Sequence, residues 1–382
     1  MKPLRIAIDA RKLSDTGIGR FSINLIREIA FIDRYNLYHI LVRKRDVALI
    51  TSLSLPSNFS IRPTTSSNYS VGEIIEISAL ASLLGFDLWI SSHYVVPPFR
   101  RCALIATVHD LIHLRQAAAS PVHRLYAYTM LTVACRADSV VTWSLDSMRD
   151  IRERRGTSSG ITLISGAPAA VFHSHRSEED DCRLRRLGLA PPYVLYVGMI
   201  KPHKNLDRLV CAFAEVVQGQ SHLDRLKLAL IASPALSATP LQGTIDTLGV
   251  GGRVEQRSNL SDEDVAAIMR HAELLVLPSL IEGYGLPIIE AMACGTPVVA
   301  SNCPALRETA QGAAELVDPL EIVSIAKGLR EVLLDNDVRA RLVAAGHRRV
   351  AGLTWRDSAT KVVSLYAPAL EHYTGTGRRW RA

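Results

Sequence analysis

The chain has 382 residues, of which 48% are apolar and 21% charged, with a net charge of +7 and a pI of about 9.2. This length predicts roughly two to three domains, and the composition excludes a disordered chain and a solenoid. The charges are dispersed and no basic stripe carries interleaved aromatics, which argues against nucleic acid as the anionic partner and leaves nucleotide diphosphates and anionic membranes.

Short β-branched runs alternate with helical patterns through the first half of the chain. The run 4–9 (LRIAID) predicts a strand, followed by a glycine-containing turn and a helix that ends near Phe31. This alternation is typical of a parallel sheet with helices on both faces. Further strands are predicted at 38–44, 87–92, 104–110 and 139–144.

The same pattern starts again after a polar stretch, 173–192, that ends in two prolines. The run 193–200 predicts a buried strand, and a helix is expected over 205–218. We therefore expect an α/β protein built from two similar, doubly wound, Rossmann-like domains. Later strands are predicted at 226–233, 253–258, 274–279 and 297–301, and the last helices at 338–350 and 355–371.

This repeat sets the expected domain boundaries. The N-terminal domain takes residues 1–175, a linker with one short helix takes 176–192, and the C-terminal domain takes 193–365. The tail, 366–382, is expected to pack back on the N-terminal domain. Ligands of open α/β sheets lie beyond the carboxyl ends of the strands, so two such domains facing each other predict a ligand site in the cleft between them.

The stretch 282–301, EGYGLPIIEAMACGTPVVAS, follows a predicted strand and places two glutamates around a glycine-containing loop. Pro287 suits the first turn of a helix and Gly295 suits its end. The free N–H groups of the helix start favour anions or sugar hydroxyls. Glu290 can accept hydrogen bonds from a ribose diol, and Glu282 can hold the other end of the ligand. The alternative is that Glu282 is an ordinary loop residue and Glu290 a solvated helix residue.

This stretch resembles the E-x7-E signature of retaining glycosyltransferases of glycosyltransferase family 4. The resemblance extends through DARKLSDTGIGRFSINL, IATVHDL, VTWSLDS, YVGMIKPHKNLDRLVCAF and ELVDP. It implies a GT-B fold, in which the C-terminal domain holds a nucleotide-sugar donor. It also implies that Glu290 binds the ribose and that Glu282, with the amides after it, holds the donor sugar. The other expected donor-binding residues of this region are Leu260, Gly283, Tyr284, Gly285 and Leu286.

The segment YVGMIKPHKN ends a predicted strand and offers lysine ammonium groups, which suit a diphosphate. The resemblance makes Lys204 the phosphate ligand. Family members usually add an arginine in this loop, whereas this chain has Met199 and His203 in the corresponding places. Lys201 is therefore the candidate for the second cation. The alternative is a solvated basic turn.

In the first half of the chain, His109 and Asp110 end a predicted strand. The resemblance makes His109 a donor-sugar contact near the reacting carbon, with Asp110 orienting its loop or contacting the acceptor. Gly17 and Gly19 form an incomplete dinucleotide fingerprint, which argues against a dehydrogenase; in the resembling family this turn approaches the diphosphate. Arg20 is either a helix-surface residue or an acceptor-phosphate contact.

Together these features predict retaining glycosyl transfer, with His109, Lys204 and Glu282 as the catalytic set. Neither a metal nor a cofactor is expected, because Lys204 and helix dipoles offset the charge of the leaving diphosphate. The resemblance implies GDP-mannose as the first donor to consider and a lipid-linked saccharide, such as a polyprenyl-diphosphate saccharide, as the acceptor in polysaccharide assembly. The alternatives are a GT-B sugar-nucleotide epimerase and a non-catalytic nucleotide-sugar-binding protein.

The expected location is the cytoplasm, with the inner face of the cytoplasmic membrane as an open alternative. The N-terminal apolar run is interrupted at Asp9 and does not form a signal peptide. Six scattered cysteines without CxxC spacing indicate reduced thiols in a reducing compartment. The segment 115–137 combines basic residues with an apolar stretch, so it is either an ordinary amphipathic core helix or a membrane-surface helix.

Overall fold

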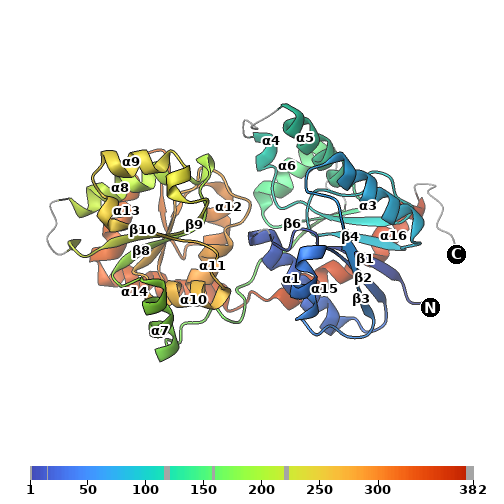
Figure 1. The fold of residues 1–382 in the computed structure, drawn as a ribbon, viewed down its shortest axis with the longest axis horizontal. Coiled ribbons are helices and arrows are strands. Elements are labelled where there is room, and N and C mark those ends of the chain that lie inside the picture. Colours follow the sequence, from blue (N-terminus) through green and yellow to red (C-terminus); the bar gives the residue numbers. More distant parts are fainter. Residues whose placement is uncertain (1, 15, 116–120, 157–159, 219–222, 376–382) are drawn as a thin grey trace. The chain divides into compact units, whose positions relative to one another are not determined.

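The computed structural model describes the chain except for residues 1, 15, 116–120, 157–159, 219–222 and 376–382. The chain forms two compact units (Figure 1). Unit 1 comprises Met1–Gly166 and Thr354–Ala382, and unit 2 comprises Ala167–Leu353. Each unit is described by itself below.

Unit 1 is built on a seven-stranded sheet in which every neighbouring pair of strands is parallel, in the order β3-β2-β1-β4-β5-β6-β7. The chain winds from β1 toward one edge and then returns to β4 and winds toward the other. The topological switch point therefore lies between β1 and β4. The strands are β1 (Arg5–Asp9), β2 (Leu37–Arg43), β3 (Phe59–Thr64), β4 (Leu88–Ser91), β5 (Ala103–Thr107), β6 (Ser139–Thr142) and β7 (Ile161–Leu163).

The helices of unit 1 come from both ends of the chain. Two of them, α15 and α16, belong to the returning segment, and α15 packs along α1 (Figure 1). The phenol oxygens of Tyr38 and Tyr366 lie 3.4 Å apart, and His372 contacts Asp138 at 2.9 Å, which anchors α16. The helices are α1 (Thr16–Ile32), α2 (Val47–Thr51), α3 (Val71–Leu83), α4 (Ile112–Arg115), α5 (Pro121–Cys135), α6 (Leu145–Arg155), α15 (Trp355–Ser364) and α16 (Tyr366–Gly375).

Unit 2 repeats the plan with a six-stranded parallel sheet in the order β10-β9-β8-β11-β12-β13, so its switch point lies between β8 and β11. Its strands are β8 (Tyr193–Met199), β9 (Lys227–Ser233), β10 (Val254–Arg257), β11 (Leu274–Leu277), β12 (Val298–Ser301) and β13 (Glu315–Val317). Its helices are α7 (Glu178–Leu187), α8 (Leu206–Val217), α9 (Leu241–Thr247), α10 (Asp262–His271), α11 (Leu286–Ala293), α12 (Pro304–Ala310), α13 (Ile322–Leu334) and α14 (Asn336–Val350).

Burial explains why these segments form central strands. The residues of β4, β5, β11 and β12 are buried along their whole length. Both faces of a parallel sheet are covered by helices, so its central strands carry continuous apolar runs. In unit 1, Gly19 permits the tight turn into α1, because a Cβ at this position would lie 2.0 Å from the carbonyl oxygen of Leu13.

The expected fold class, two parallel-sheet α/β domains, is confirmed. Three strands, β3, β7 and β13, were not predicted. Each lies at a sheet edge and is partly buried; β7 and β13 have three residues each, and β3 contains Pro63. The observed division also differs from the expected boundaries, since α15 belongs to unit 1 and the expected linker 176–192 belongs to unit 2. Of the expected tail, 376–382 lies outside the described residues.

Helix α7 belongs to unit 2 because buried ion pairs fasten it to α10. Arg270 donates two hydrogen bonds of 2.7 Å to the two carboxylate oxygens of Asp180, and both side chains are at most 5% exposed. Arg183 and Arg186 also contact Asp264, at 2.9 and 2.5 Å. These ion pairs add to the apolar contacts that Leu184 and Leu187 of this polar helix make with the unit 2 core.

Removing the carboxylate of Asp180 is expected to destabilise unit 2. The Asp180→Ala variant leaves the buried guanidinium of Arg270 unpaired, which costs about 3 kcal/mol. Calorimetry of the purified protein measures the loss as a lower melting temperature of one transition.

Glu178→Ala is the matched control, because Glu178 lies in the first turn of the same helix and is exposed. We expect it to change stability by less than about 0.5 kcal/mol. Equal melting temperatures for the two variants would contradict the role given to the Asp180–Arg270 pair.

Candidate active site

The loop between β11 and α11 is shaped by one glycine. Gly285 has φ +98°, a left-handed conformation that disfavours side chains, and a Cβ there would lie 2.5 Å from the Cδ2 of Leu306. Helix α11 starts at the next residue, with Pro287 in its first turn, and Gly295 follows its end at φ +74°. The structure thus confirms the expected helix, with its free N–H groups at the carboxyl end of β11.

Glu282 lies in this loop and forms an ion pair with Lys204. The Nζ of Lys204 donates to the Oε1 of Glu282 at 2.6 Å, and the hydroxyl of Ser279 donates to the same oxygen at 2.8 Å. The two charged side chains are 19% and 11% exposed. These partners exclude the interpretation of Glu282 as an ordinary solvated loop residue.

Two further bonds join the loop that carries Lys204 to the loop that carries Glu282. The side-chain amide of Asn205 donates to the carbonyl oxygen of Pro278 at 3.0 Å, and its other bond, of 2.6 Å, reaches the carbonyl of Pro319 in the segment after β13. The backbone N–H of Leu280 donates to the carbonyl of His203 at 2.8 Å. The loops after β8 and β11, on either side of the switch point, therefore form one connected structure.

Glu290 is buried in α11, with 1% of its surface exposed. Burying a carboxylate is costly unless polar groups surround it, so this position is not that of a solvated helix residue. Its charge contributes to the raised pKa of Cys294, about 12, for which burial is the main cause. The structure thus brings Lys204 and Glu282 into direct contact and places Glu290 inside the helix that follows.

The remaining expected donor-binding residues of unit 2 lie near Lys204 or Glu282 in the sequence, and they differ in how exposed their side chains are. Lys201 is exposed at the start of the short 3-10 segment Pro202–Lys204. His203 is buried and Met199 is 38% exposed, so neither presents an exposed cation. Tyr284 and Leu286 are buried, and Leu260 is half-buried against the unit 2 core.

In unit 1, His109 follows β5 and its Nε2 donates to the carbonyl oxygen of Ser92 at 2.8 Å. Burial lowers the pKa of His109, against the opposing effects of the Ser92 carbonyl and Asp110. The carboxylate of Asp110 accepts the backbone N–H of Ile112 at 3.0 Å, a bond that orders its own loop. Gly17 is exposed and Arg20 is half-buried, both in the first turns of α1.

Unit 1 also holds buried charges that the sequence analysis did not single out. Arg11 donates from Nε and Nη2 to the two oxygens of Asp9, at 2.8 and 2.7 Å, and from Nη1 to Glu73 at 2.7 Å. All three side chains are at most 2% exposed. Tyr126 on α5 donates to the other oxygen of Glu73 at 2.9 Å. The network fixes the carboxyl end of β1 beside the switch point.

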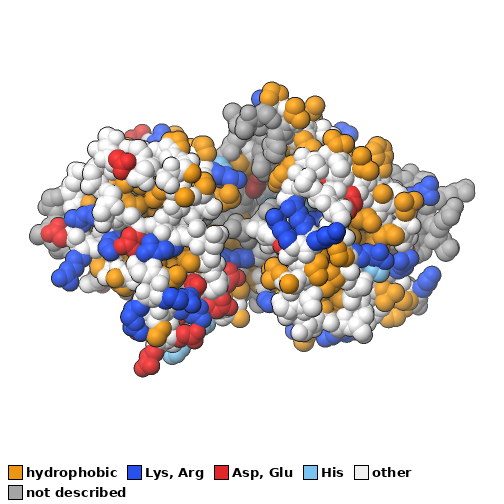
Figure 2. Space-filling view, viewed as in Figure 1, with side chains coloured by type: hydrophobic (Ala, Val, Ile, Leu, Met, Phe, Trp, Pro, Cys, Tyr) orange, Lys and Arg blue, Asp and Glu red, His pale blue; other side chains and the backbone are white. Residues whose placement is uncertain are grey.

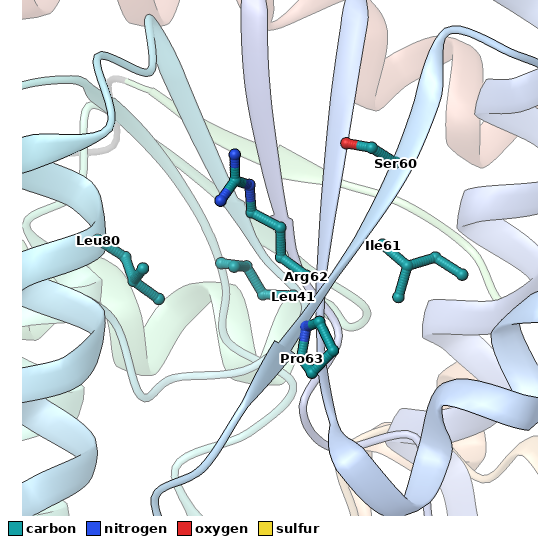
Figure 3. A pocket seen from close by; sticks show the side chains of 6 residues that line it. All are labelled: Leu41, Ser60, Ile61, Arg62, Pro63 and Leu80. Atoms are coloured by element: carbon teal, nitrogen blue, oxygen red, sulfur yellow. The ribbon is translucent and has the colours of Figure 1, made fainter.

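A hollow of about 300 Å³ lies elsewhere in unit 1 (Figure 3). Its lining comes from β2, β3 and α3, and Arg62 is its charged residue. None of the expected site residues lines it, so we assign it no part in the candidate site. The lining residues are Leu41, Ser60, Ile61, Arg62, Pro63 and Leu80.

The described residues contain neither a metal-ligating cluster nor a membrane-spanning helix. No group of three or more histidine, cysteine, aspartate or glutamate side chains among them is arranged to hold a metal ion. No helix within the described ranges is long and apolar enough to cross a membrane. None of the six cysteines, all of which lie among the described residues, forms a disulfide, and four of them are buried.

Comparison with known proteins identifies the second unit. Residues 185–349 match the family model described as "Glycosyl transferases group 1". Unit 2 is a group 1 glycosyltransferase domain. The Lys204–Glu282 pair and the buried Glu290 all belong to this glycosyltransferase domain.

The relatives extend the match into unit 1. The chain is 29% identical over 290 residues to a D-inositol 3-phosphate glycosyltransferase of Geodermatophilus obscurus, covering 72% of this chain and 63% of that protein. It is 29% identical over 174 residues to O-antigen chain mannosyltransferase B of Escherichia coli, covering 46% of this chain and 45% of that protein. The chain thus spans less than two thirds of these relatives.

One solved structure shows the fold of the whole chain. HepE of Anabaena, solved in complex with UDP and glucose, superposes with a TM-score of 0.73 at 18% identity, covering 95% of this chain and 99% of that one. At this identity the likeness concerns the fold alone, and it confirms the expected GT-B arrangement of two parallel-sheet domains.

Asn205 and Ser279 are site residues that sequence reasoning missed. Asn205 has φ +62°, a conformation that asparagine tolerates better than most residues, and it ends the motif KPHKN. Ser279 stands three residues before Glu282. The sequence positions of Asn205 and Ser279 could have indicated this role, because short polar residues at strand ends often bond to neighbouring loops.

Asn205→Gly is expected to loosen the loop of Glu282. Glycine keeps the left-handed backbone but removes the two hydrogen bonds that the side-chain amide donates and the one that Oδ1 accepts from Arg208 at 2.9 Å, which lowers stability by about 1–2 kcal/mol. Hydrogen exchange followed by mass spectrometry should show faster exchange in peptides covering 279–285.

The control is Asn259→Gly, because Asn259 has a similar φ of +56° in the same unit and is exposed. It should leave exchange at 279–285 unchanged. If Asn205→Gly also leaves it unchanged, the two loops do not depend on this side chain.

Proposed function

We propose that the chain is a retaining glycosyltransferase that transfers a hexose from a nucleotide sugar to a saccharide acceptor. The observation that carries the proposal is the Lys204–Glu282 pair at the switch point of a group 1 glycosyltransferase domain. A cation for the diphosphate and a carboxylate for the sugar hydroxyls lie in contact there, next to the start of a helix.

The charges of this pair suggest how a diphosphate is held. Without a ligand, the positive charge of Lys204 is offset by Glu282 at 2.6 Å. A diphosphate therefore needs further donors, and we assign this role to Lys201 and to the N–H groups at the start of α11. Lys204 then bonds to Glu282 and a phosphate oxygen together, using two of its three protons.

The sugar and the ribose are assigned to the two glutamates. The two hydrogen bonds that reach Glu282 from described residues end on Oε1, so Oε2 is the oxygen we assign to a donor-sugar hydroxyl. Glu290 is assigned to the ribose diol. The backbone of Gly283 to Leu286 completes the sugar contacts, and Leu260 contributes an apolar contact on the nucleoside side.

The proposed reaction breaks the bond between the anomeric carbon and the diphosphate oxygen. The anomeric carbon gains oxocarbenium character, and the acceptor hydroxyl attacks from the face that the diphosphate leaves. A phosphate oxygen takes the acceptor proton, so the configuration is retained. Lys204 and backbone N–H groups stabilise the leaving diphosphate without a metal ion. His109, neutral at pH 7 because burial lowers its pKa, is assigned to a hydroxyl of the donor sugar.

The names of the relatives support the proposed donor and acceptor classes. The E. coli relative is named as an O-antigen chain mannosyltransferase, which supports GDP-mannose as donor and a saccharide of polysaccharide assembly as acceptor. HepE of Anabaena was solved with UDP and glucose, which makes UDP-glucose the first competing donor to test.

Calorimetric titration with GDP-mannose, UDP-glucose and further nucleotide sugars tests the proposal. We expect one donor to bind and to be slowly hydrolysed, with α-configured sugar transferred once an acceptor is added. Conversion of the sugar nucleotide to its epimer would instead indicate the epimerase, and binding without turnover toward any acceptor the non-catalytic protein.

Glu290→Gln is expected to weaken donor binding about 10- to 100-fold, because a charged hydrogen bond to the ribose contributes about 1.5–3 kcal/mol. The affinity for the free sugar should not change. Titration at matched protein stability measures the effect.

Glu331→Gln is the control, because Glu331 is 42% exposed on α13 of the same unit. Donor affinity of the Glu290 variant equal to that of the parent would refute the ribose assignment.

We also propose that unit 1 contacts an anionic membrane through α5. Its inner face packs Met130, Leu131 and Ala134 into the core, so it is a core helix. Its outer face nevertheless exposes Val122 (78%) and Leu125 (67%).

Arginines border this apolar face. The guanidinium of Arg154 lies 4.8 Å from the ring of Tyr128, which is itself 53% exposed, and Arg124 is exposed on α5. Figure 2 shows hydrophobic side chains gathered over this part of unit 1. Apolar side chains ringed by arginines suit an acidic lipid surface, where a lipid-linked acceptor would lie. Residues 116–120 of the segment 115–137 lie outside the described residues.

Replacing Val122, Leu125 and Tyr128 by serine is expected to abolish flotation with vesicles of phosphatidylglycerol while leaving donor binding intact. The parent should float with these vesicles and not with phosphatidylcholine alone, since the arginines require anionic lipid.

Val323→Ser with Leu320→Ser removes comparably exposed apolar side chains from unit 2, which are 67% and 59% exposed, and serves as the control. If the parent protein floats with neither kind of vesicle, the membrane contact is refuted.

A further inference from the structure

The imidazole of His109 lies in a cluster of aromatic rings. Phe21 on α1 contacts it edge-on, with ring centroids 5.3 Å apart and planes at 87°. Trp143, which follows β6, contacts it at 5.2 Å and 67°. Edge-to-face contacts of this kind fix the orientation of a ring as well as its position.

Trp355 supports the two aromatic rings that contact His109. It is the first residue of α15, and its ring lies 6.1 Å from that of Phe21 and 6.0 Å from that of Trp143. It is 7% exposed. Helix α15 is itself held in unit 1, because the Ser358 hydroxyl donates to the carbonyl of Ser165 at 2.5 Å. The segment that returns from unit 2 to unit 1 thus places an aromatic ring behind the neighbours of His109.

The hydrogen bond to Ser92 determines which imidazole nitrogen carries the proton. A carbonyl oxygen only accepts, so Nε2 is protonated, and Nδ1 of the neutral ring is the acceptor. Ser92 is fixed in turn, since both its backbone N–H and its hydroxyl donate to the carbonyl of Asp9, at 3.3 and 2.8 Å.

The surroundings keep this ring neutral. Burial lowers the pKa of His109, and it lowers the pKa of nearby His93 still further, so His93 adds no positive charge. Asp110 is the charged group that opposes the shift. The contacts that α1 and the segment after β6 make with the ring are aromatic, from Phe21 and Trp143.

We propose that Trp355 is a positioning residue: through Phe21 and Trp143 it holds the His109 ring so that Nε2 stays on the Ser92 carbonyl and Nδ1 remains the acceptor nitrogen. The inference rests on the proposed function of His109 for its consequence, but the state of the ring can be measured without it. Trp355 lies outside residues 185–349 and outside every motif that indicated the site.

Nitrogen-15 NMR of the histidine rings tests the proposal on the full chain, with His109→Gln to assign the signal. In the parent we expect the Nε2-protonated tautomer and a pKa below the ordinary value of about 6.5. Trp355→Leu should admit water to the cluster, raise that pKa toward the ordinary value and mix the two tautomers. Trp355→Phe, which keeps a ring, should restore the parent signal.

Turnover gives the second readout. Trp355→Leu should lower kcat about tenfold with little change in the donor KM, because a misplaced side chain affects the reacting geometry more than binding. Since the neutral ring is the active form, a higher pKa moves the acidic limb of the pH profile to higher pH. Trp355→Phe should recover to within about twofold of the parent.

Val362→Ala controls for stability, because Val362 is a buried residue of α15 outside the aromatic cluster. It should lower the melting temperature without changing the His109 signal. The proposal fails if folded Trp355→Leu shows the parent tautomer and titration. It also fails if the parent itself lacks the Nε2-protonated form, an outcome that needs no variant to fold. A disturbed ring together with full activity of His109→Gln would instead refute the function of His109.

Discussion

The ion pair between Lys204 and Glu282 is the interaction on which the candidate site depends. It joins two loops that follow strands β8 and β11, and those strands are neighbours only because the chain reverses its winding between them. The fold thus brings opposite charges together without any local sequence contact. Since the pair is partly shielded from water, each charge limits where the other can move, and a ligand that contacts one necessarily acts on both.

Unit 1 applies the same principle at its own switch point. Arg11 contacts Asp9 and Glu73 at the end of β1, while the carbonyl oxygen of Ser92, just after β4, accepts a hydrogen bond from His109. In both units the carboxyl edge of the sheet is therefore preorganised by paired polar groups that are buried or partly shielded from water. Such groups rigidify a site when all are satisfied, and this rigidity is what a group-transfer reaction requires of its side chains.

The sequence was sufficient for the repeated α/β pattern, because central strands such as β5 and β11 are short apolar runs between helices. It was insufficient at the sheet edges, where β13 is three residues long and partly exposed. At the site, the glycines of the loop, Pro287 and Gly295 predicted the loop and the helix. The partner of Glu282 lies 78 residues away, so only the strand order shows that Lys204 reaches it. No motif in the sequence indicated a role for Trp355 in the site.

Unit 2 is an insertion within unit 1, because the chain leaves unit 1 at Gly166 and returns to it at Thr354. During synthesis on the ribosome, all of unit 2 emerges before α15 and α16, so it can fold while unit 1 still lacks two helices. The apolar surface of α1 that α15 covers therefore stays uncovered until the segment that forms α15 has been synthesised. Vectorial synthesis therefore makes unit 1 the later unit to mature, although its sequence comes first.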